Sequence, residues 1–335
     1  MRAPAVASMV LLPLTEFGIG PQAQIGCHEL STAAHSLVEV AVSAPRVEAS
    51  AAGAIVLAGL VPRNGEPVHP ESQAARAAKR LAGASPAERA RVQAALAAAG
   101  PEQRPYVLQA FAAGHSADEV ARFAQLIRGR TPEWLRTHLT LIDPSGLGSV
   151  TYQASPVKQT DDTTCGSMAI LMARAMADPL YALYLTTGDS TDPAAAGAAQ
   201  FEARLATEEQ RIHDATNHFW PQRLGSTPSG ISNELNRHAD ALGTWYEPQL
   251  VTRARGSSAL RDAVATADGA QPVPVLIGDW IPRHYVLLVG RDGGDLLFYE
   301  PTHATLTRVS EQGFLDGNLG ALGFQHVYAV ITPSR

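Results

Sequence analysis

The sequence predicts an α+β fold, in which most helices precede the strands of a separate sheet. From about residue 70 to residue 268, apolar residues recur at helical spacing between recognisable start and stop signals. From residue 273 onward the chain changes to short runs of β-branched and aromatic residues separated by turns. Helices followed by an antiparallel series of strands are typical of the α+β class.

Length and composition predict a soluble globular chain that is longer than one core usually organises. The chain has 335 residues, of which 45% are hydrophobic and 17% are charged, so there is ample apolar material for a core. A chain of this length usually forms two folded units, or one domain with a large appendage. The net charge is −6 and the basic residues are scattered, which argues against a nucleic-acid partner.

The distribution of proline, glycine and helix-capping residues divides the chain into three regions. Residues 1–66 mix short apolar runs with proline and glycine, and no architecture is predicted for them. Residues 67–142 are predicted to form a small helical bundle that ends at a loop rich in proline and glycine. Residues 143–335 are predicted to form the second domain, with a helical insertion at about 186–243. The bundle is interpreted as a scaffold against this domain, with a docking or regulatory module as the alternative.

Helix starts are easy to recognise in the predicted bundle. Ser85 with Glu88, and Ser116 with Glu119, each have the spacing of a capping box, in which the side chains and backbone at the helix start bond to each other. Thr131 begins a further helix, because proline follows it at the first helical position. We therefore expect about four to five short helices in this region.

A polar stretch that ends in a cysteine carries the predicted chemistry. Residues 158–167 read Lys-Gln-Thr-Asp-Asp-Thr-Thr-Cys-Gly-Ser, and an apolar helix is predicted from Cys165 to Ala177. The first turn of a helix has free N–H groups and the positive end of the dipole, so a thiol placed there ionises more readily. Cys165 is therefore a candidate nucleophile, and the alternative is a buried thiol without a chemical role.

A predicted hairpin supplies a candidate base and a group that could orient it. His284 opens the first strand, a Gly-Gly turn follows, and Glu300 ends the return strand. With the turn centred on the two glycines, Glu300 is expected near Leu287, within diagonal reach of the His284 ring. The alternative for Glu300 is a solvated carboxylate at the end of a strand.

A glutamine upstream completes the candidate site. Gln159 precedes Cys165 by 165 − 159 = 6 residues, so its side-chain amide could donate to an oxyanion formed beside the sulfur. The alternative is that Gln159 only caps a turn. No metal and no cofactor are expected.

Four short motifs together resemble those of papain-like cysteine peptidases, and more narrowly those of the bacteriocin-leader-processing, or double-glycine, peptidases. The matching residues are Gln159, Cys165-Gly166, His284-Tyr285 and Glu300-Pro301. The resemblance covers about residues 150–335 and implies a nucleophile helix packed on an antiparallel sheet. It also implies a triad of Cys165, His284 and Glu300, with Gln159 as the oxyanion donor.

Three features depart from the pattern of that family. Glu300 stands where the family usually has aspartate, so its carboxylate is one methylene farther from the backbone. The interval from Cys165 to His284 is 284 − 165 = 119 residues and includes a helical stretch, 194–242, that is expected to form a cap or a wall of the cleft. The chain has neither an apolar span of about 20 residues nor the Gly-rich phosphate-binding motif, so a soluble stand-alone relative is expected.

The predicted function is hydrolysis of a peptide or isopeptide bond through a thioester acyl-enzyme. The expected partner is a peptide or protein substrate, and the oligomeric state is left open. Acyl transfer or deamidation on the same thioester chemistry, as in transglutaminase-like enzymes, is the alternative within enzymes. A degenerate peptidase domain that only binds a partner is the alternative outside enzymes.

Other residues carry secondary hypotheses. His213 and His218 lie 218 − 213 = 5 residues apart, which puts them on different helical faces and argues against a zinc pair, so a solvated helix end is expected. Trp220, Trp245 and Trp280 are expected in the core, with Trp280 alternatively lining the cleft. Cys27 is interpreted as a structural thiol, since two cysteines make neither a disulfide framework nor a zinc site.

The N-terminal region gives only weak targeting signals. An apolar run at 5–14 resembles a signal peptide, but Pro13 interrupts it and no small-residue cleavage site follows. The apolar run at 49–61 is shorter than the roughly 20 residues of a membrane span, so a buried helix is expected there. A cytoplasmic location is therefore expected, with secretion as the open alternative.

Overall fold

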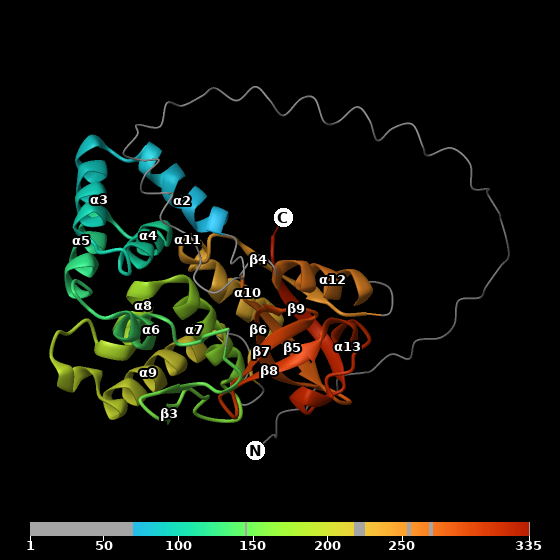
Figure 1. The fold of residues 1–335 in the computed structure, drawn as a ribbon. Coiled ribbons are helices and arrows are strands. Elements are labelled where there is room, and N and C mark those ends of the chain that lie inside the picture. The colour runs from blue at the N-terminus through green and yellow to red at the C-terminus, as the bar shows by residue number, and fades with distance from the viewer. Residues whose placement is uncertain (1–69, 145, 218–224, 253–255, 268–270, 335) are drawn as a thin grey trace, which may run out of the picture. The chain divides into compact units, whose positions relative to one another are not determined.

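The computed structural model describes residues 70–334, apart from 145, 218–224, 253–255 and 268–270 (Figure 1). The described residues belong to one compact unit, Ser50–Arg335. They form twelve α-helices and a seven-stranded antiparallel sheet, so the α+β prediction is confirmed at this level. The predictions for residues 1–66, which include Cys27 and the run at 49–61, lie outside the described residues.

Five short helices form in the region of the predicted bundle, and three of them begin at the predicted capping residues Ser85, Ser116 and Thr131. They are α2 Pro70–Gly83, α3 Pro86–Ala98, α4 Arg104–Ala112, α5 Ala117–Leu126 and α6 Pro132–Leu139. Both predicted capping boxes are present: the Ser85 hydroxyl accepts from the Glu88 N–H, and the Ser116 hydroxyl accepts from the Glu119 N–H, each at 3.3 Å. Apolar side chains of these helices meet in one core, because each helix turns an apolar face inward.

A second group of helices surrounds the helix that begins at the candidate nucleophile. The group consists of α7 Cys165–Ala177, α8 Pro179–Thr187, α9 Ala198–Thr216, α10 Pro228–Asn236 and α11 Ala239–Leu242. Helix α7 is apolar on nearly all sides, and ten of its residues are buried, as expected for a helix at the centre of a core. Helices α8, α9 and α10 all pack on α7, so the predicted insertion at about 186–243 forms part of this core.

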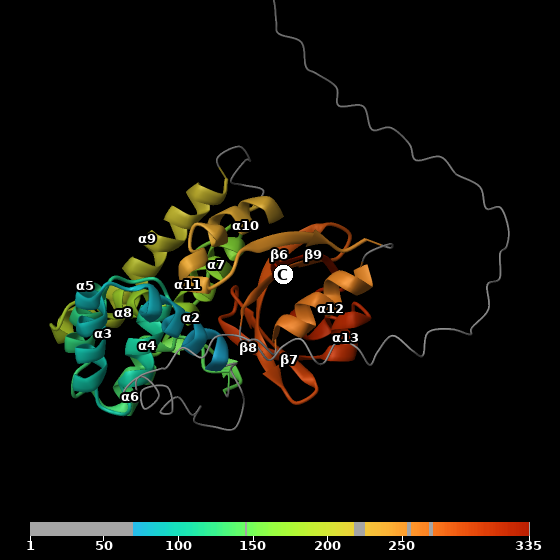
Figure 2. The same cartoon turned by 90° about the horizontal axis from the view of Figure 1, so that it is seen from above.

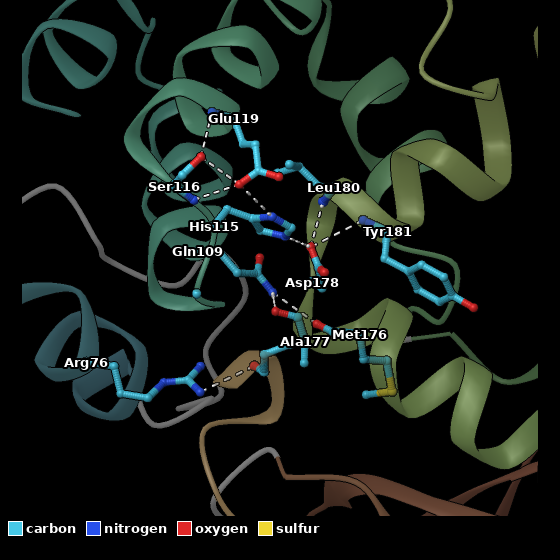
Figure 3. Close-up of polar contacts among 12 residues, drawn as sticks. Arg76, Gln109, His115, Ser116, Glu119, Met176, Ala177, Asp178, Leu180 and Tyr181 are labelled. Carbon is cyan, nitrogen blue, oxygen red and sulfur yellow. Dashed lines mark hydrogen bonds and ion pairs between the residues drawn. The ribbon is translucent and has the colours of Figure 1, made fainter. Parts of the chain in front are cut away.

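Polar contacts fix the bundle to the C-terminal end of α7 (Figure 3). The Gln109 side-chain amide donates to the carbonyl oxygens of Met176 and Ala177 at 3.0 and 3.4 Å. His115 Nε2 lies 2.9 Å from Asp178 Oδ1, and the same oxygen accepts from two N–H groups at the start of α8. The end of α7 is therefore held between the bundle and α8.

The strands of the main sheet follow the order β1-β8-β7-β6-β5-β9-β4, and β2 with β3 forms a separate ribbon (Figure 1). The bounds are β1 Gly148–Ser149, β2 Thr151–Tyr152, β3 Ser155–Pro156, β4 Tyr246–Leu250, β5 Val273–Gly278, β6 Pro282–Asp292, β7 Asp295–Glu300, β8 Thr305–Ser310 and β9 His326–Pro333. Strands β5 to β8 are consecutive neighbours, as the predicted meander requires. Strand β9 instead returns to pair with β5, and β4 extends the sheet beyond it.

Different helices cover the two faces of the sheet (Figure 2). On β6, Leu287 packs in the core that contains α7. Its neighbour Leu288 packs in the core that contains α12 (Gly256–Ala267) and α13 (Glu311–Leu315). Successive residues of a strand point to opposite faces, so β6 contributes to both cores.

Within the described residues, no single helix is both long enough and apolar enough to cross a membrane. Helices α7 and α8 meet the criterion only together, and they are bent by 115° at their junction.

The prediction that tryptophans lie in the core is wrong for Trp245 and Trp280, and Trp220 lies outside the described residues. Trp245 is 63% exposed and precedes the edge strand β4, where one side of the chain faces solvent. Trp280 is 97% exposed and lies in the connection between β5 and β6, outside the packed faces of the sheet. Apolar character alone does not place a residue in a core when the backbone turns at that position.

Candidate active site

Cys165 is the first residue of α7 and lies beside strand β6. It is 3% exposed, and its sulfur accepts a hydrogen bond from the Tyr285 N–H at 3.4 Å. A Cβ on Gly166 would lie 2.7 Å from Ile231 Cδ1 and 3.2 Å from the Tyr285 ring, so only glycine fits without a shift of its neighbours. The Cys-Gly pair therefore lets the helix start approach β6 closely, next to His284.

A buried carboxylate from α9 fixes the loop before the cysteine. Glu209 is 0% exposed, and its two carboxylate oxygens accept from the Thr160 N–H at 3.1 and 3.0 Å. Burial raises the pKa of Glu209, and the hydrogen bonds from the loop oppose that shift. Asp161 also acts within the loop, because its Oδ1 accepts from the Thr163 N–H at 2.7 Å. The Asp161 carboxylate therefore stabilises the turn before helix α7.

Sequence reasoning missed Glu209, although a signal for it exists. Glu209 follows Leu205 by 209 − 205 = 4 residues and precedes Ile212 by 212 − 209 = 3 residues, so it lies on the apolar face of its helix. An acidic residue on a core face needs hydrogen-bond partners, which points to a structural role.

His213, one turn later, is only 3% exposed, so the predicted solvated helix end is wrong there, and His218 lies outside the described residues.

The described residues contain no group of three or more histidine, cysteine or acidic side chains placed to hold a metal ion.

His284 and Glu300 are in direct contact. His284 Nε2 lies 2.7 Å from Glu300 Oε1, and each residue is 7% exposed. The Thr302 N–H donates to the same carboxylate oxygen at 2.9 Å, and the His303 N–H donates to the other at 2.8 Å. The imidazole of His284 also stacks on the Phe324 ring, with 5.6 Å between centroids. The alternative of a solvated carboxylate at residue 300 is therefore wrong.

The candidate base and its partner shift each other's protonation. Burial lowers the pKa of His284, but the hydrogen bonds and charges of Cys165 and Glu300 outweigh burial and raise this pKa to about 9. Burial raises the pKa of Glu300, but the hydrogen bonds from His284 and from two backbone N–H groups hold this pKa well below its usual range. The stable pair at neutral pH is therefore an imidazolium with a carboxylate.

A β-bulge decides on which face of the sheet Glu300 lies. The pairs are Gly290 with Leu297 near the turn, and Leu287 with Tyr299 beyond it. Val289 is the extra residue between these two registers. The prediction that Glu300 lies near Leu287 is therefore wrong by one residue in the register. A shift of one residue in the register moves every side chain of a strand to the opposite face of the sheet. The bulge therefore brings Glu300 to the same face as His284.

Gln159 connects the loop before Cys165 to the turn after Glu300. It is 8% exposed, its backbone N–H donates to the Pro301 carbonyl at 2.9 Å, and its Oε1 accepts from the Thr302 hydroxyl at 3.3 Å. Its Nε2 donates to the Asp161 carbonyl at 2.6 Å. An amide nitrogen carries two hydrogens, so one donor of Gln159 remains for another acceptor.

A cavity of about 830 Å³ lies away from these residues, among helices α5, α7, α8 and α9. Its lining is charged with both signs and includes His115, Arg174, Asp178, Glu208 and Arg211. Several of these groups bind each other, since His115 contacts Asp178 and Arg211 contacts Glu208. None of Cys165, His284, Glu300 and Gln159 lines this cavity, so it is separate from the candidate active site.

No protein-family model matches this chain, and no curated protein matches it significantly. A function of this chain is therefore inferred from its sequence motifs and from the geometry of the residues they contain.

Proposed function

We propose that this chain is a papain-like cysteine hydrolase, which cleaves a peptide or isopeptide bond through a thioester acyl-enzyme. The observation that supports this best is the buried His284–Glu300 contact of 2.7 Å beside the Cys165 sulfur. A histidine with a pKa of about 9 stays protonated at neutral pH, and an imidazolium stabilises a neighbouring thiolate. A nucleophile at the start of a helix that packs on an antiparallel sheet is also the arrangement expected of papain-like peptidases.

In the proposed acylation step, the Cys165 thiolate attacks the carbonyl carbon of the scissile bond. A C–S bond forms and the carbonyl oxygen becomes an oxyanion. The first N–H groups of an α-helix have no partner within the helix, so the start of α7 supplies donors for this oxyanion, together with the Gln159 amide. The imidazolium of His284 then gives its proton to the leaving amine as the C–N bond breaks.

In the proposed deacylation step, water attacks the thioester. The neutral His284 accepts the proton of the water, the C–S bond breaks, and the thiolate–imidazolium pair returns. Glu300 keeps the imidazole in one orientation through both steps and stabilises its charged form.

The substrate is proposed to be a peptide or a protein. Trp280 and Ile281 are 97% and 56% exposed, and they lie just before His284 in the chain. An apolar side chain of a substrate that covers them would remove apolar surface of both partners from water. This supports a substrate with a bulky apolar residue near the cleaved bond.

The thiolate–imidazolium pair is tested by the rate at which iodoacetamide alkylates Cys165. At about pH 6 the wild type is expected to react readily, and His284→Ala is expected to react at least about tenfold more slowly. Cys27 is the reference thiol within the same chain. Alkylation of Cys165 no faster than that of Cys27, or an unchanged rate in the variant, would instead favour a degenerate domain that only binds a partner.

The mass of the product separates the possible acyl acceptors. Hydrolysis of a peptide bond adds one water, whereas deamidation of a glutamine side chain replaces NH₂ by OH and adds about 1 Da. Transfer to an amine adds the mass of that amine without ammonia. Cys165→Ala is expected to abolish all three products, since each passes through the same thioester.

A further inference from the structure

The Glu300 carboxylate is bound at both oxygens, and one of its partners is a second imidazole. Oε1 lies 2.7 Å from His284 Nε2 and accepts from the Thr302 N–H at 2.9 Å. Oε2 accepts from the His303 N–H at 2.8 Å and lies 2.7 Å from His303 Nδ1. A carboxylate has about four acceptor positions, and these four contacts use them. Two histidines therefore bind opposite oxygens of one carboxylate.

The length of the Glu300 side chain explains why it needs this many partners. Glutamate has one more rotatable bond than aspartate, so fixing its carboxylate against His284 costs more conformational entropy. The turn after β7 provides the donors, because the Thr302 and His303 N–H groups both point at the carboxylate. Ala304 follows with a φ of 51°, a left-handed conformation within the same turn. The turn and the His303 ring together limit the positions of the carboxylate.

We propose that His303 is a positioning residue for the candidate active site. Its Nδ1–H donates to Glu300 Oε2 and thereby keeps Oε1 directed at His284. The inference rests on the proposed function, because His303 acts only through Glu300 on the residue that activates Cys165.

If the contact between His303 and Glu300 served only to stabilise the fold, its loss would lower the unfolding temperature of the protein. The His303 side chain is 78% exposed, and a contact made by so exposed a group contributes little to the stability of a fold. Its loss should therefore leave the unfolding temperature nearly unchanged. The effect should be found in the reactivity of Cys165, because a Glu300 that can rotate stabilises the imidazolium less well.

The test compares His303→Ala with His303→Asn in the full-length protein. Asparagine carries an N–H donor on its γ-carbon, as histidine does with Nδ1, so it can still bind Glu300 Oε2. At about pH 6, alkylation of Cys165 is expected to slow roughly fivefold in His303→Ala, the factor for one lost hydrogen bond. His303→Asn is expected to stay within about twofold of the wild type. With a peptide substrate, the loss in His303→Ala should appear in kcat and not in KM.

Two further variants make the result decisive. Arg308→Ala removes an exposed side chain of the next strand that pairs with Asp292 near the hairpin turn, and it should leave alkylation unchanged. If His284→Ala slows alkylation and His303→Ala does not, the positioning role is overturned while the proposed function stands. If Ala and Asn at residue 303 slow alkylation equally, the donor is irrelevant and the role is also overturned. If His284→Ala itself has no effect, the proposed function fails and the inference fails with it.

Discussion

His138 and His284 are both buried histidines, but their protonation is opposite. His138, in α6, is 5% exposed, and its pKa is lowered to about 4. His284, in β6, is 7% exposed, and its pKa is raised to about 9. The exposed fractions are nearly equal, so burial alone does not decide the direction of the shift.

In the described part of the chain, both causes that shift the pKa of His138 lower it. Burial is the main cause of its low pKa, and the positive charge of Arg130 lowers it further. Its ring lies 4.2 Å from that of Trp134, and its Nδ1 lies 3.1 Å from the Tyr152 hydroxyl. A neutral imidazole is the stable form in such surroundings.

The surroundings of His284 differ from those of His138 in that they contain a buried carboxylate, Glu300, and a thiol, Cys165. Burial lowers the pKa of His284 as well, but the contacts with Cys165 and Glu300 outweigh it. Glu300 is itself buried, so its charge is poorly screened by water and acts strongly on the imidazole. The buried Glu300 carboxylate therefore distinguishes His284, which is protonated at neutral pH, from His138, which is neutral.

Glu300→Gln should give the largest change, because it removes the buried carboxylate that distinguishes the surroundings of His284 from those of His138 and leaves only the contact with Cys165. The amide keeps the shape but not the charge, so the pKa of His284 should fall from about 9, while the contact with Cys165 continues to raise it. The imidazolium is lost as the pH rises through this pKa. The alkaline fall in kcat/KM should therefore move from near pH 9 to a clearly lower pH, and turnover at neutral pH should drop about 100-fold.

The matched control for this variant is Glu311→Gln, which removes a partly exposed carboxylate paired with Arg291. This control should keep the turnover rate of the wild type at neutral pH, and its kcat/KM should fall at the same alkaline pH (the alkaline limb of the profile). An alkaline limb that stays near pH 9 in Glu300→Gln would contradict the assignment of that limb to His284.

His138→Phe should produce a smaller change, in stability at acid pH. The folded pKa of His138 is about 4 and the unfolded value is about 6.5, so only the unfolded chain gains a proton between these values. The wild type should therefore lose about 2 kcal/mol of stability from this group as the pH falls from 7.5 to about 4.5. The phenylalanine variant should lack this loss, while the Tyr152 hydroxyl keeps the Thr186 and Ala196 carbonyl oxygens as acceptors.

Urea unfolding at the two pH values measures this difference. The wild type and His138→Phe should differ more at pH 4.5 than at pH 7.5, in favour of the variant. Parallel changes in the two proteins would show that His138 is not held neutral by the fold.

The parts of the fold that depend on local contacts could be predicted from the sequence. The capping boxes at Ser85 and Ser116 involve residues three positions apart, so the pattern contains all the partners. The pairing of β9 with β4, which joins Leu250 to Ala329, involves residues distant in the sequence. No local pattern specifies such a partner, so β4 was missed and the position of β9 was not foreseen.

The residues of the candidate site were predicted more completely than their geometry. Cys165, His284 and Glu300 follow from motifs, but the contact between the last two depends on the bulge at Val289, which the alternation of the strand does not reveal. His303 was missed for a related reason. Its ring reaches Glu300 only because the backbone turns sharply after β7, and three residues of sequence do not specify that turn.

Arg130→Gln should give the smallest change, and it isolates the part of the His138 shift that does not come from burial. The Arg130 guanidinium lies 4.6 Å from the centroid of the Trp134 ring and lowers the pKa of His138 by its charge. Glutamine removes this charge and leaves the Arg130 carbonyl, which accepts from Gln103, in place. The pKa of His138 should therefore rise by a few tenths of a unit, since charges near a surface interact weakly. An NMR titration follows His138 and His284 in one sample, and only His138 should shift. An equal shift of both rings would mean that the substitution changes the fold, and no shift of His138 would mean that burial alone sets its pKa.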